Sequence, residues 1–366
     1  MEYDEAGFRY PVINYDKCIV CHLCERTCPS LKNENIDRPY KKTYAGYSDD
    51  KNLLLSTSSG GFATALSKLF LEEGGRIAGV RLSHNLINSE YNLASTVPEI
   101  KEFACSKYVQ SEKNGIFKNV LNSLKSGEKV LFIGCPCDVA GLVSFIGDSP
   151  KDNLLTCELV CMGVTSPIIS KQFIQYAEKK YKSKVVSFNA RSKKLGWFVS
   201  TLELKFESGK FKTKPLYGTY FGRGFLIYNR PSCFYCKYRG TNGAADLRIG
   251  DFWGIKKSDP YWNKDGVSCI FARTQKGIEA IEKLKENNFS LFEVDYKEAT
   301  DNNTSSTKNK GKKYIKLSER FKDILLTKGL IEACEETSNL GFKLKRILPG
   351  RFQPILKQLY HSLRDK

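Results

Sequence analysis

With 366 residues, the chain is long enough for two or three domains, or for one large core with appendages. Hydrophobic residues make up 41% of it, but no apolar run is long enough to cross a bilayer. Residues 1–10 are acidic and lack the apolar segment of a signal peptide, so we expect a soluble, cytoplasmic protein without a transmembrane segment. In that reducing compartment its 13 cysteines indicate metal or redox chemistry rather than disulfides.

Charge and histidine content narrow the class of function. The formal net charge of +18 favours an anionic partner, which could be an acidic electron-carrier protein, a phosphate-bearing cofactor, nucleic acid or a membrane surface. Much of the excess lies in residues 308–316 and 343–366. Only three histidines occur, which weakens any histidine-based zinc site or Ser–His–Asp triad.

Four cysteines stand close together near the start of the chain: Cys18, Cys21, Cys24 and Cys28. Their spacing, C-x2-C-x2-C-x3-C-P, is typical of bacterial ferredoxins, in which the fourth cysteine serves the other cluster of a two-cluster module. Only one copy occurs, so residues 1–40 are predicted to form a partial ferredoxin-like [4Fe-4S] module. It ends in a polar linker at residues 32–39.

Residues 41–182 alternate short β-branched runs with amphipathic segments. We expect strands at residues 77–82, 130–133 and 154–160, and helices at residues 62–73, 116–125 and 168–181. This alternation predicts an α/β core.

The pattern changes to period two from residue 183, and residues 183–300 are predicted to be a mixed α+β continuation. We expect strands at residues 184–188, 197–206, 211–214, 246–251 and 267–272, with a hairpin turn at 207–210.

Residues 301–366 form the last predicted part. Within it, residues 302–312 are polar and low in complexity, which indicates a mobile or extended connection. Two short helices then close the chain. The last, at residues 354–364, is basic and amphipathic; it is expected to pack on its own protein, with membrane or partner docking as the alternative.

A second set of cysteines is spread through the core: Cys137, Cys161, Cys233 and Cys236. Cys137 and Cys161 each follow a predicted strand, and loops at the carboxyl edge of a sheet could present them together. Four thiolates converging there could hold one more [4Fe-4S] cluster. A lone C-x2-C also fits zinc or thiol redox use, and free cysteines are often small core residues, as we expect of Cys105, Cys157, Cys269 and Cys334.

Residues 56–61, Ser-Thr-Ser-Ser-Gly-Gly, directly precede the helix predicted at 62–73. Small residues before a helix amino terminus let backbone amides approach a phosphate, so this loop is a candidate cradle for the pyrophosphate of a dinucleotide. It is neither a G-x-G-x-x-G fingerprint nor a P-loop, and an ordinary N-cap and turn is the alternative. Residues 105–108, 191–197 and 246–254 also combine charges, glycines and aromatic rings in ways that suggest more than packing.

Taken in order, these motifs resemble the coenzyme F420 hydrogenase/dehydrogenase β-subunit family over about residues 8–275. The matching segments are 18–29, 58–66, 106–108, 134–142, 161–164, the pair Cys233 and Cys236, and 250–254. The resemblance implies a flavoprotein that binds FAD and iron–sulfur clusters and passes electrons between a ferredoxin-like donor and an organic acceptor. Related proteins reduce the deazaflavin coenzyme or chlorophyll-type pigments, and many bacterial members accompany surface-polysaccharide genes.

Carried over by position, the resemblance gives roles to individual residues. It implies that Cys137, Cys161, Cys233 and Cys236 are the core cluster ligands, with Cys135 an extra thiol. Asp138 replaces the glutamine that usually follows Pro-Cys in the family. The segments expected near the flavin are Ser58, Ser59, Gly60, Gly61, Ser106, Lys107 and Tyr108. Among them, Lys107 and Tyr108 are the candidate catalytic residues. Residues 41–182 and 183–300 would then be the two parts of the flavin-binding core.

The front of the chain departs from the family pattern. Relatives commonly carry two ferredoxin runs joined by a linker that resembles residues 4–11, and here the first run is absent. Cys18, Cys21 and Cys24 then lack their usual fourth ligand, and Cys28 its cluster. Three explanations stay open: the true start lies upstream, a single cluster recruits Cys28 or another donor, or the module is decaying.

Three functions compete at this stage. The leading hypothesis is a flavin-dependent iron–sulfur oxidoreductase with one or two [4Fe-4S] clusters. Such a protein would bind an acidic ferredoxin and would not bind nucleic acid. It would work alone or within a larger complex. A cysteine-rich, metal-bound nucleic-acid-binding protein would also use the +18 charge, but the basic residues form no recognition motif and the cysteine spacing is not that of a zinc finger. A non-catalytic electron-transfer subunit is the third.

Overall fold

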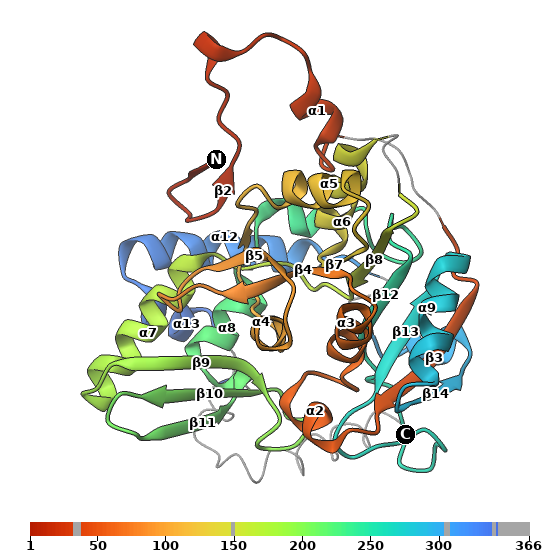
Figure 1. The fold of residues 1–366 in the computed structure, drawn as a ribbon. Coiled ribbons are helices and arrows are strands. Elements are labelled where there is room, and N and C mark those ends of the chain that lie inside the picture. The colour runs from red at the N-terminus through yellow and green to blue at the C-terminus, as the bar shows by residue number, and fades with distance from the viewer. Residues whose placement is uncertain (32–37, 148–150, 304–307, 339–341, 343–366) are drawn as a thin grey trace.

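A mixed nine-stranded sheet forms the centre of the computed structural model, which describes residues 1–31, 38–147, 151–303, 308–338 and 342 (Figure 1). Its strands in chain order are β3 (Lys42–Ser48), β4 (Arg76–Leu82), β5 (Ser89–Ala94), β6 (Ser111–Glu112), β7 (Val130–Gly134), β8 (Leu154–Leu159), β12 (Leu247–Asp251), β13 (Ser268–Ala272) and β14 (Phe289–Glu293). Their order across the sheet is β14-β3-β13-β12-β8-β7-β4-β5-β6. Parallel pairing joins β4, β7, β8 and β12, whereas β13, β3 and β14 pair antiparallel beside them. The predicted α/β core with a mixed sheet is confirmed.

Helices cover both faces of this sheet. One face packs on α3 (Phe62–Glu72), α4 (Val97–Phe103) and α9 (Gln275–Lys285), and the other on α5 (Ile116–Lys125) and α6 (Pro136–Ile146). Strand β7 shows why both faces need cover: Leu131 enters the first cluster, whereas Val130 and Phe132 enter the second. A strand buried on both sides has a continuous apolar run in its sequence, and this run predicted β7.

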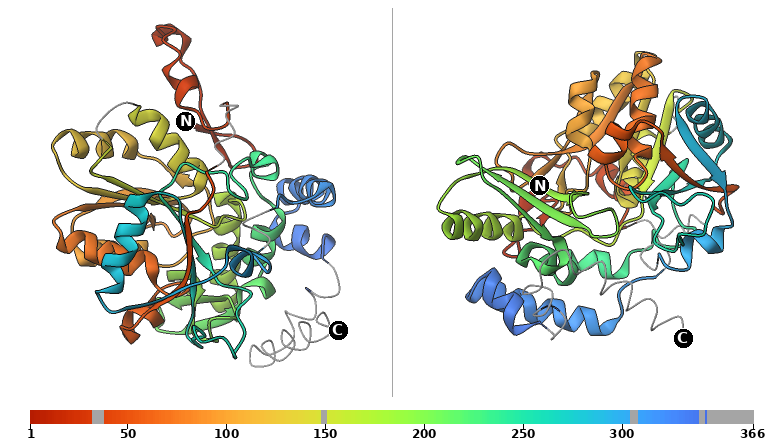
Figure 2. Two further views of the ribbon diagram at one scale, coloured as in Figure 1. Left: turned by 90° about the vertical axis from the view of Figure 1, so that its right-hand side faces the viewer. Right: turned by 90° about the horizontal axis from the view of Figure 1, so that it is seen from below.

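A smaller antiparallel sheet lies beside the main one. It consists of β9 (Val185–Ser192), β10 (Thr201–Phe206) and β11 (Phe211–Pro215), with β10 in the middle. A separate apolar cluster joins it to α7 (Pro167–Tyr181), α8 (Tyr220–Ile227), α12 (Lys312–Thr327) and α13 (Leu330–Glu336). Both views of Figure 2 place α12 and α13 on the outside of the molecule next to α8. The predicted helical C-terminal end is confirmed as far as residue 338.

The N-terminal segment is anchored at its base and projects beyond it. A two-stranded ribbon, β1 (Glu2–Tyr3) and β2 (Arg9–Tyr10), precedes the short helices η1 (Tyr15–Lys17) and α1 (Leu23–Thr27). Phe8 is fully buried with its ring 5.4 Å from that of Tyr228, whose hydroxyl donates to the carbonyl of Ala6. From this anchor the cysteine-bearing segment extends away from the body (Figure 1).

Most sequence-predicted elements agree with the structure to within two residues. Two strands differ by more than that. The strand expected at residues 184–188 continues to Ser192 as β9, and β10 begins only at Thr201 instead of residue 197, because Trp197 turns inward and its indole N–H donates to Asp251. Helix α12 is also longer than the short helix expected there. The helix expected at residues 354–364 lies outside the described residues, as do residues 32–37 of the polar linker and 304–307 of the polar connection. No helix in the described ranges is long and apolar enough to span a membrane.

Candidate functional site: a cavity beside five cysteines

A cavity of about 280 Å³ lies at the carboxyl ends of the parallel strands. Its wall takes Gly134 and Cys135 from the end of β7, residues 159–164 from the end of β8, and Asp251 from the end of β12. This edge is where open α/β sheets bind their ligands. The volume is just below the usual range for small-molecule sites, which is about 300–1,000 Å³.

The loop between α2 (Lys51–Ser56) and α3 forms one wall of the cavity, and most of it is fixed by packing. The hydroxyl of Ser59 donates to the carbonyl of Val267 at 2.8 Å, and the N–H of Gly60 donates to the Ser268 hydroxyl at 2.9 Å. A side chain on Gly60 would place its Cβ 2.1 Å from the carbonyl oxygen of Gly46. Ser59 and Gly60 therefore hold the loop against β3 and β13.

Ser58 differs from its neighbours in the loop. Its hydroxyl oxygen is buried in the cavity wall and has no hydrogen-bond partner within the described part of the chain. Leaving a buried hydroxyl unpaired costs about 1–3 kcal/mol, so this wall lacks one hydrogen bond that a polar ligand group would supply. Because α3 begins four residues later, at Phe62, an anionic group such as a pyrophosphate fits this position.

Lys107 and Tyr108 lie on the cavity wall, but their side chains have different surroundings. The Lys107 amine donates to the carbonyls of Glu102, Ala104 and Cys105 at 2.8, 2.7 and 3.2 Å, which closes the C-terminal end of α4. Burial lowers the pKa of Lys107 to about 8. The Tyr108 ring lies 4.3 Å from that of Phe225. Lys107 thus uses its three donors on backbone carbonyls, and a catalytic role for either residue stays a prediction.

Arg191, Asp251 and Trp253 line another part of the cavity wall, and Trp197 stacks on Trp253; the sequence did not predict that these residues meet. Arg191 is almost fully buried and its Nη2 lies 2.7 Å from Oδ1 of Asp251, which also accepts from the indole of Trp197 at 2.7 Å. The Trp197 and Trp253 rings stack with centroids 5.6 Å apart, and Arg191 lies over the Trp253 ring. Residues 191–197 and 246–254, singled out separately in the sequence, meet here. No local signal could have paired them, because about sixty residues separate Arg191 from Asp251.

Five cysteines from three segments converge next to this cavity. Cys135 is the N-cap of α6 and Cys137 lies in its first turn, Cys161 follows β8, and the pair Cys233 and Cys236 lies at the short helix η3 (Pro231–Tyr235). The sulfurs of Cys135 and Cys161 are 3.9 Å apart. Close approach of the other segments is visible at Gly163, where a Cβ would lie 3.3 Å from that of Cys233. The fold thus brings the predicted core quartet together, with Cys135 as a fifth member; we call these five the core cysteine group.

The core cysteine group does not have the geometry of a mononuclear site. In the described residues, no three His, Cys, Asp or Glu side chains are placed to hold a single metal ion. A cluster of four irons and four sulfides is larger than one ion, so its ligands stand farther apart. The donor set, cysteine without histidine or carboxylate, is the one that iron–sulfur clusters use.

Hydrogen bonds and charges differentiate the core cysteines. The pKa of Cys161 is lowered to about 7, first by a hydrogen bond from Cys135 and also by the N–H of Gly163 and the guanidinium of Arg239. Cys137 is exposed, and its thiol donates to the neighbouring carboxylate of Asp138 at 3.9 Å. Asp138, which stands where the family usually has glutamine, accepts from the Tyr91 hydroxyl at 2.9 Å and pairs with Lys113 at 2.8 Å.

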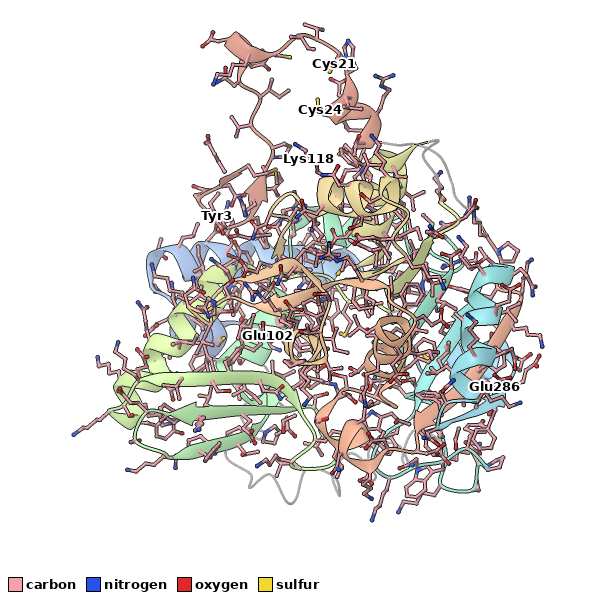
Figure 3. The ribbon with its side chains drawn as sticks, in the orientation of Figure 1. Tyr3, Cys21, Cys24, Glu102, Lys118 and Glu286 are labelled. Carbon is pink, nitrogen blue, oxygen red and sulfur yellow. The ribbon has the colours of Figure 1, made fainter. Side chains whose placement is uncertain are left out.

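The front cysteines are placed differently. Cys18, Cys21 and Cys24 are exposed and Cys28 is partly buried, and Figure 3 shows Cys21 and Cys24 on the projecting segment. The second half of this run meets the core. Helix α1, which carries Cys24, lies against α6, the hydroxyl of Tyr238 donates to the carbonyl of Pro29 at 3.0 Å, and Tyr238 packs beside Cys236.

A family model matches the part of the chain that carries the core cysteine group. Residues 127–296 match the family model for the C terminus of the coenzyme F420 hydrogenase/dehydrogenase beta subunit. This stretch, a little under half of the chain, is similar to that family. The stretch contains the core cysteine group and the Arg191–Asp251 pair, and it confirms the resemblance drawn from the motifs.

Other comparisons bear on the fold alone. A chain of the F420-reducing [NiFe] hydrogenase complex from Methanosarcina barkeri, solved in a study of xenon derivatization, is 21% identical with a TM-score of 0.52. The match covers 79% of this chain and 95% of that chain. No curated protein matches the sequence.

Proposed function

We propose that the chain is a flavin-dependent iron–sulfur oxidoreductase. It takes electrons from a ferredoxin-like donor and passes them through one or two [4Fe-4S] clusters to FAD and on to an organic acceptor. The observation that carries this proposal is that Cys135 and Cys161 belong both to the core cysteine group and to the wall of the cavity. A cluster and a flavin bound in these places would therefore be neighbours. FAD would supply the exchange between one-electron and hydride chemistry.

Each part of the site has a proposed role. Cys137, Cys161, Cys233 and Cys236 hold the core cluster, and the front cysteines hold a second. The Ser58 hydroxyl and the amino terminus of α3 receive the pyrophosphate of FAD, while Arg191 and Trp253 line the cavity for a planar ring. The match to the family model supports an oxidoreductase role. The similar chain from Methanosarcina barkeri belongs to a complex, which supports a place for this chain in one too. The acceptor we propose is a deazaflavin or another organic molecule of the cytoplasm, with surface-polysaccharide synthesis as one setting.

Anaerobic purification of the full chain tests the proposal. We expect flavin bands over a broad iron–sulfur absorption, both bleached by dithionite. About eight irons per flavin would support two clusters, and about four would mean that the front run binds none. A colourless protein that contains zinc would contradict the proposal. Iron without flavin would instead favour a non-catalytic electron-transfer subunit.

A further inference from the structure

One lobe of the molecule carries a large share of its positive charge. Residues 179–214 contain eleven lysines and arginines but only two glutamates, a formal net charge of +9 and half that of the whole chain. This lobe is the end of α7 together with the small sheet β9–β10–β11, on the opposite side of the molecule from β3 and β14 (Figure 1). We call it the basic lobe. Clefts and surfaces of one sign attract partners of the other sign and raise their association rates.

Most of these charges face water. The exposed lysines of the basic lobe are Lys179, Lys180, Lys182, Lys184, Lys194, Lys205, Lys210 and Lys214. Figure 3 shows nitrogen-tipped side chains extending from the outer edge of the small sheet. Carboxylates balance few of them: Lys184 pairs with Glu178 at 3.3 Å, and Lys194 with Glu203 at 3.5 Å.

An exposed aromatic ring lies within the basic lobe. Phe211, on the edge strand β11, is 54% exposed and stands opposite Lys205 in the register of the sheet. The amines of Lys194 and Lys205 each lie 5.8 Å from the centre of its ring. A large apolar side chain framed by charges has the composition of a protein–protein interface, in which an aromatic anchor is surrounded by a polar rim.

The basic lobe also borders the cavity. Strand β9 carries Arg191 in the cavity wall, and Asn189 of the same strand donates to the sulfur of Cys105, another wall residue. In the register of the small sheet, Lys205 of β10 lies opposite Ser187 of β9. Ser187 is four residues before Arg191, which corresponds to about 14 Å along β9. A protein seated on Phe211 and its lysines would therefore lie against the sheet that encloses the cavity.

We propose that the basic lobe, centred on Phe211, is the docking surface for an acidic protein, which, if the proposed function holds, is the electron carrier that serves this site. The chemistry of the lobe favours a protein over nucleic acid. Its exposed cations are all lysines, whereas nucleic-acid and phosphate recognition relies on the planar fork of arginine, and Arg191 is buried in an ion pair. Lysines act as point charges that steer an acidic surface and lose their effect as salt rises.

Neutralising three lysines of the lobe tests this docking surface. The variant Lys205→Gln/Lys212→Gln/Lys214→Gln is compared with Lys118→Gln/Lys125→Gln/Lys285→Gln, which removes the same charge from exposed positions on other elements. The probe is an acidic two-cluster bacterial ferredoxin, and its binding to the full chain is measured by calorimetry at about 50 and 200 mM salt. We expect the lobe variant to bind about tenfold more weakly at low salt, with a weaker salt dependence, and the control variant to change less than about twofold. Phe211→Ala should weaken binding at both salt concentrations, because its contribution is apolar.

Other outcomes would overturn the proposal. Equal losses in both triple variants would mean that only overall charge matters. Unchanged binding together with self-association of the lobe variant would mean that the lysines protect an edge strand from pairing with other chains. Tighter lobe-dependent binding of duplex DNA or anionic vesicles than of ferredoxin would assign the surface to another class of partner. Because binding is measured without electron transfer, these results do not depend on the flavin and iron content that tests the proposed function.

Discussion

The two cysteine sets of this chain are opposites in sequence and in structure. The front set, Cys18 to Cys28, is compact in sequence but lies on an exposed segment. The core cysteine group is scattered over about a hundred residues, from Cys135 to Cys236, yet the ends of β7 and β8 and the helix η3 bring its members together. The fold itself positions the core thiols, whereas the front run projects from the body and is joined to it through α1 on α6 and the hydrogen bond from Tyr238 to Pro29. We therefore expect the two sets to respond differently to mutation.

Removing one cysteine from each set should give the largest contrast. Cys161→Ser is expected to abolish the core cluster, about four irons per chain, and to weaken flavin retention because Cys161 also lines the cavity. Cys21→Ser should affect only iron bound at the front. Iron, sulfide and flavin analysis of the anaerobically purified variants measures both effects.

A matched control is Cys334→Ala, which changes a buried cysteine in a different apolar cluster. It should keep full iron and flavin. The comparison would fail if Cys21→Ser removed as much iron as Cys161→Ser, since both sets would then serve one shared cluster.

The scaffold behind the core cysteines gives the next largest effect. Glu158, fully buried on β8, lies 2.5 Å from Arg248 and 2.8 Å from Arg273. Arg248 in turn donates to the carbonyl of Asn242 at 2.7 Å and so holds the loop that follows Cys236. Glu158→Gln leaves two buried guanidinium groups uncompensated, and we expect a loss of about 3–5 kcal/mol in the free energy of unfolding.

Chemical denaturation measures that loss, and Glu293→Gln provides the control. Glu293 pairs with Lys42 at 3.2 Å on the surface, where ion pairs contribute little. If both variants unfolded at the same denaturant concentration, the buried group would not be the support of the core loop that its contacts suggest.

The contrast between the two sets also marks what the sequence could and could not predict. Continuous apolar runs such as Val130 to Gly134 predicted the buried strands, and motif order predicted the family whose model residues 127–296 match. Strand β3 was missed because its sequence, Lys-Thr-Tyr-Ala-Gly-Tyr-Ser, is neither a continuous apolar run nor a regular alternation, although it lies between β13 and β14. The pair Arg191 and Asp251 was missed because its partners come from different sheets. Local patterns encode which face is buried, but they do not encode which distant segment covers it.

Two adjacent serines show whether the cavity beside the core cysteines is built for a ligand. Ser58→Ala removes a hydroxyl without a described partner, so it should leave the stability of the flavin-free protein unchanged and weaken FAD binding about fivefold, or about 1 kcal/mol. Ser59→Ala removes hydrogen bonds to the carbonyls of Val267 and Gly250, so it should destabilise the flavin-free fold. Thermal unfolding without FAD and fluorescence titration with FAD separate the two. A loss of stability without flavin in Ser58→Ala would mean that the hydroxyl already serves the fold.

The smallest effect is expected where the two cysteine sets meet. Tyr238 packs with Ala140 and Ala244 beside Cys236, and its hydroxyl donates to the carbonyl of Pro29. Tyr238→Phe keeps the ring and removes this one hydrogen bond, a change of about 1 kcal/mol. Because Pro29 follows Cys28, hydrogen exchange at residues 18–31 should become faster while global stability stays the same. Tyr235→Phe, a change at an exposed neighbour, should alter neither. Unchanged exchange in Tyr238→Phe would show that the front run is held to the core by other contacts, and the front set would then be less independent of the fold than its exposure indicates.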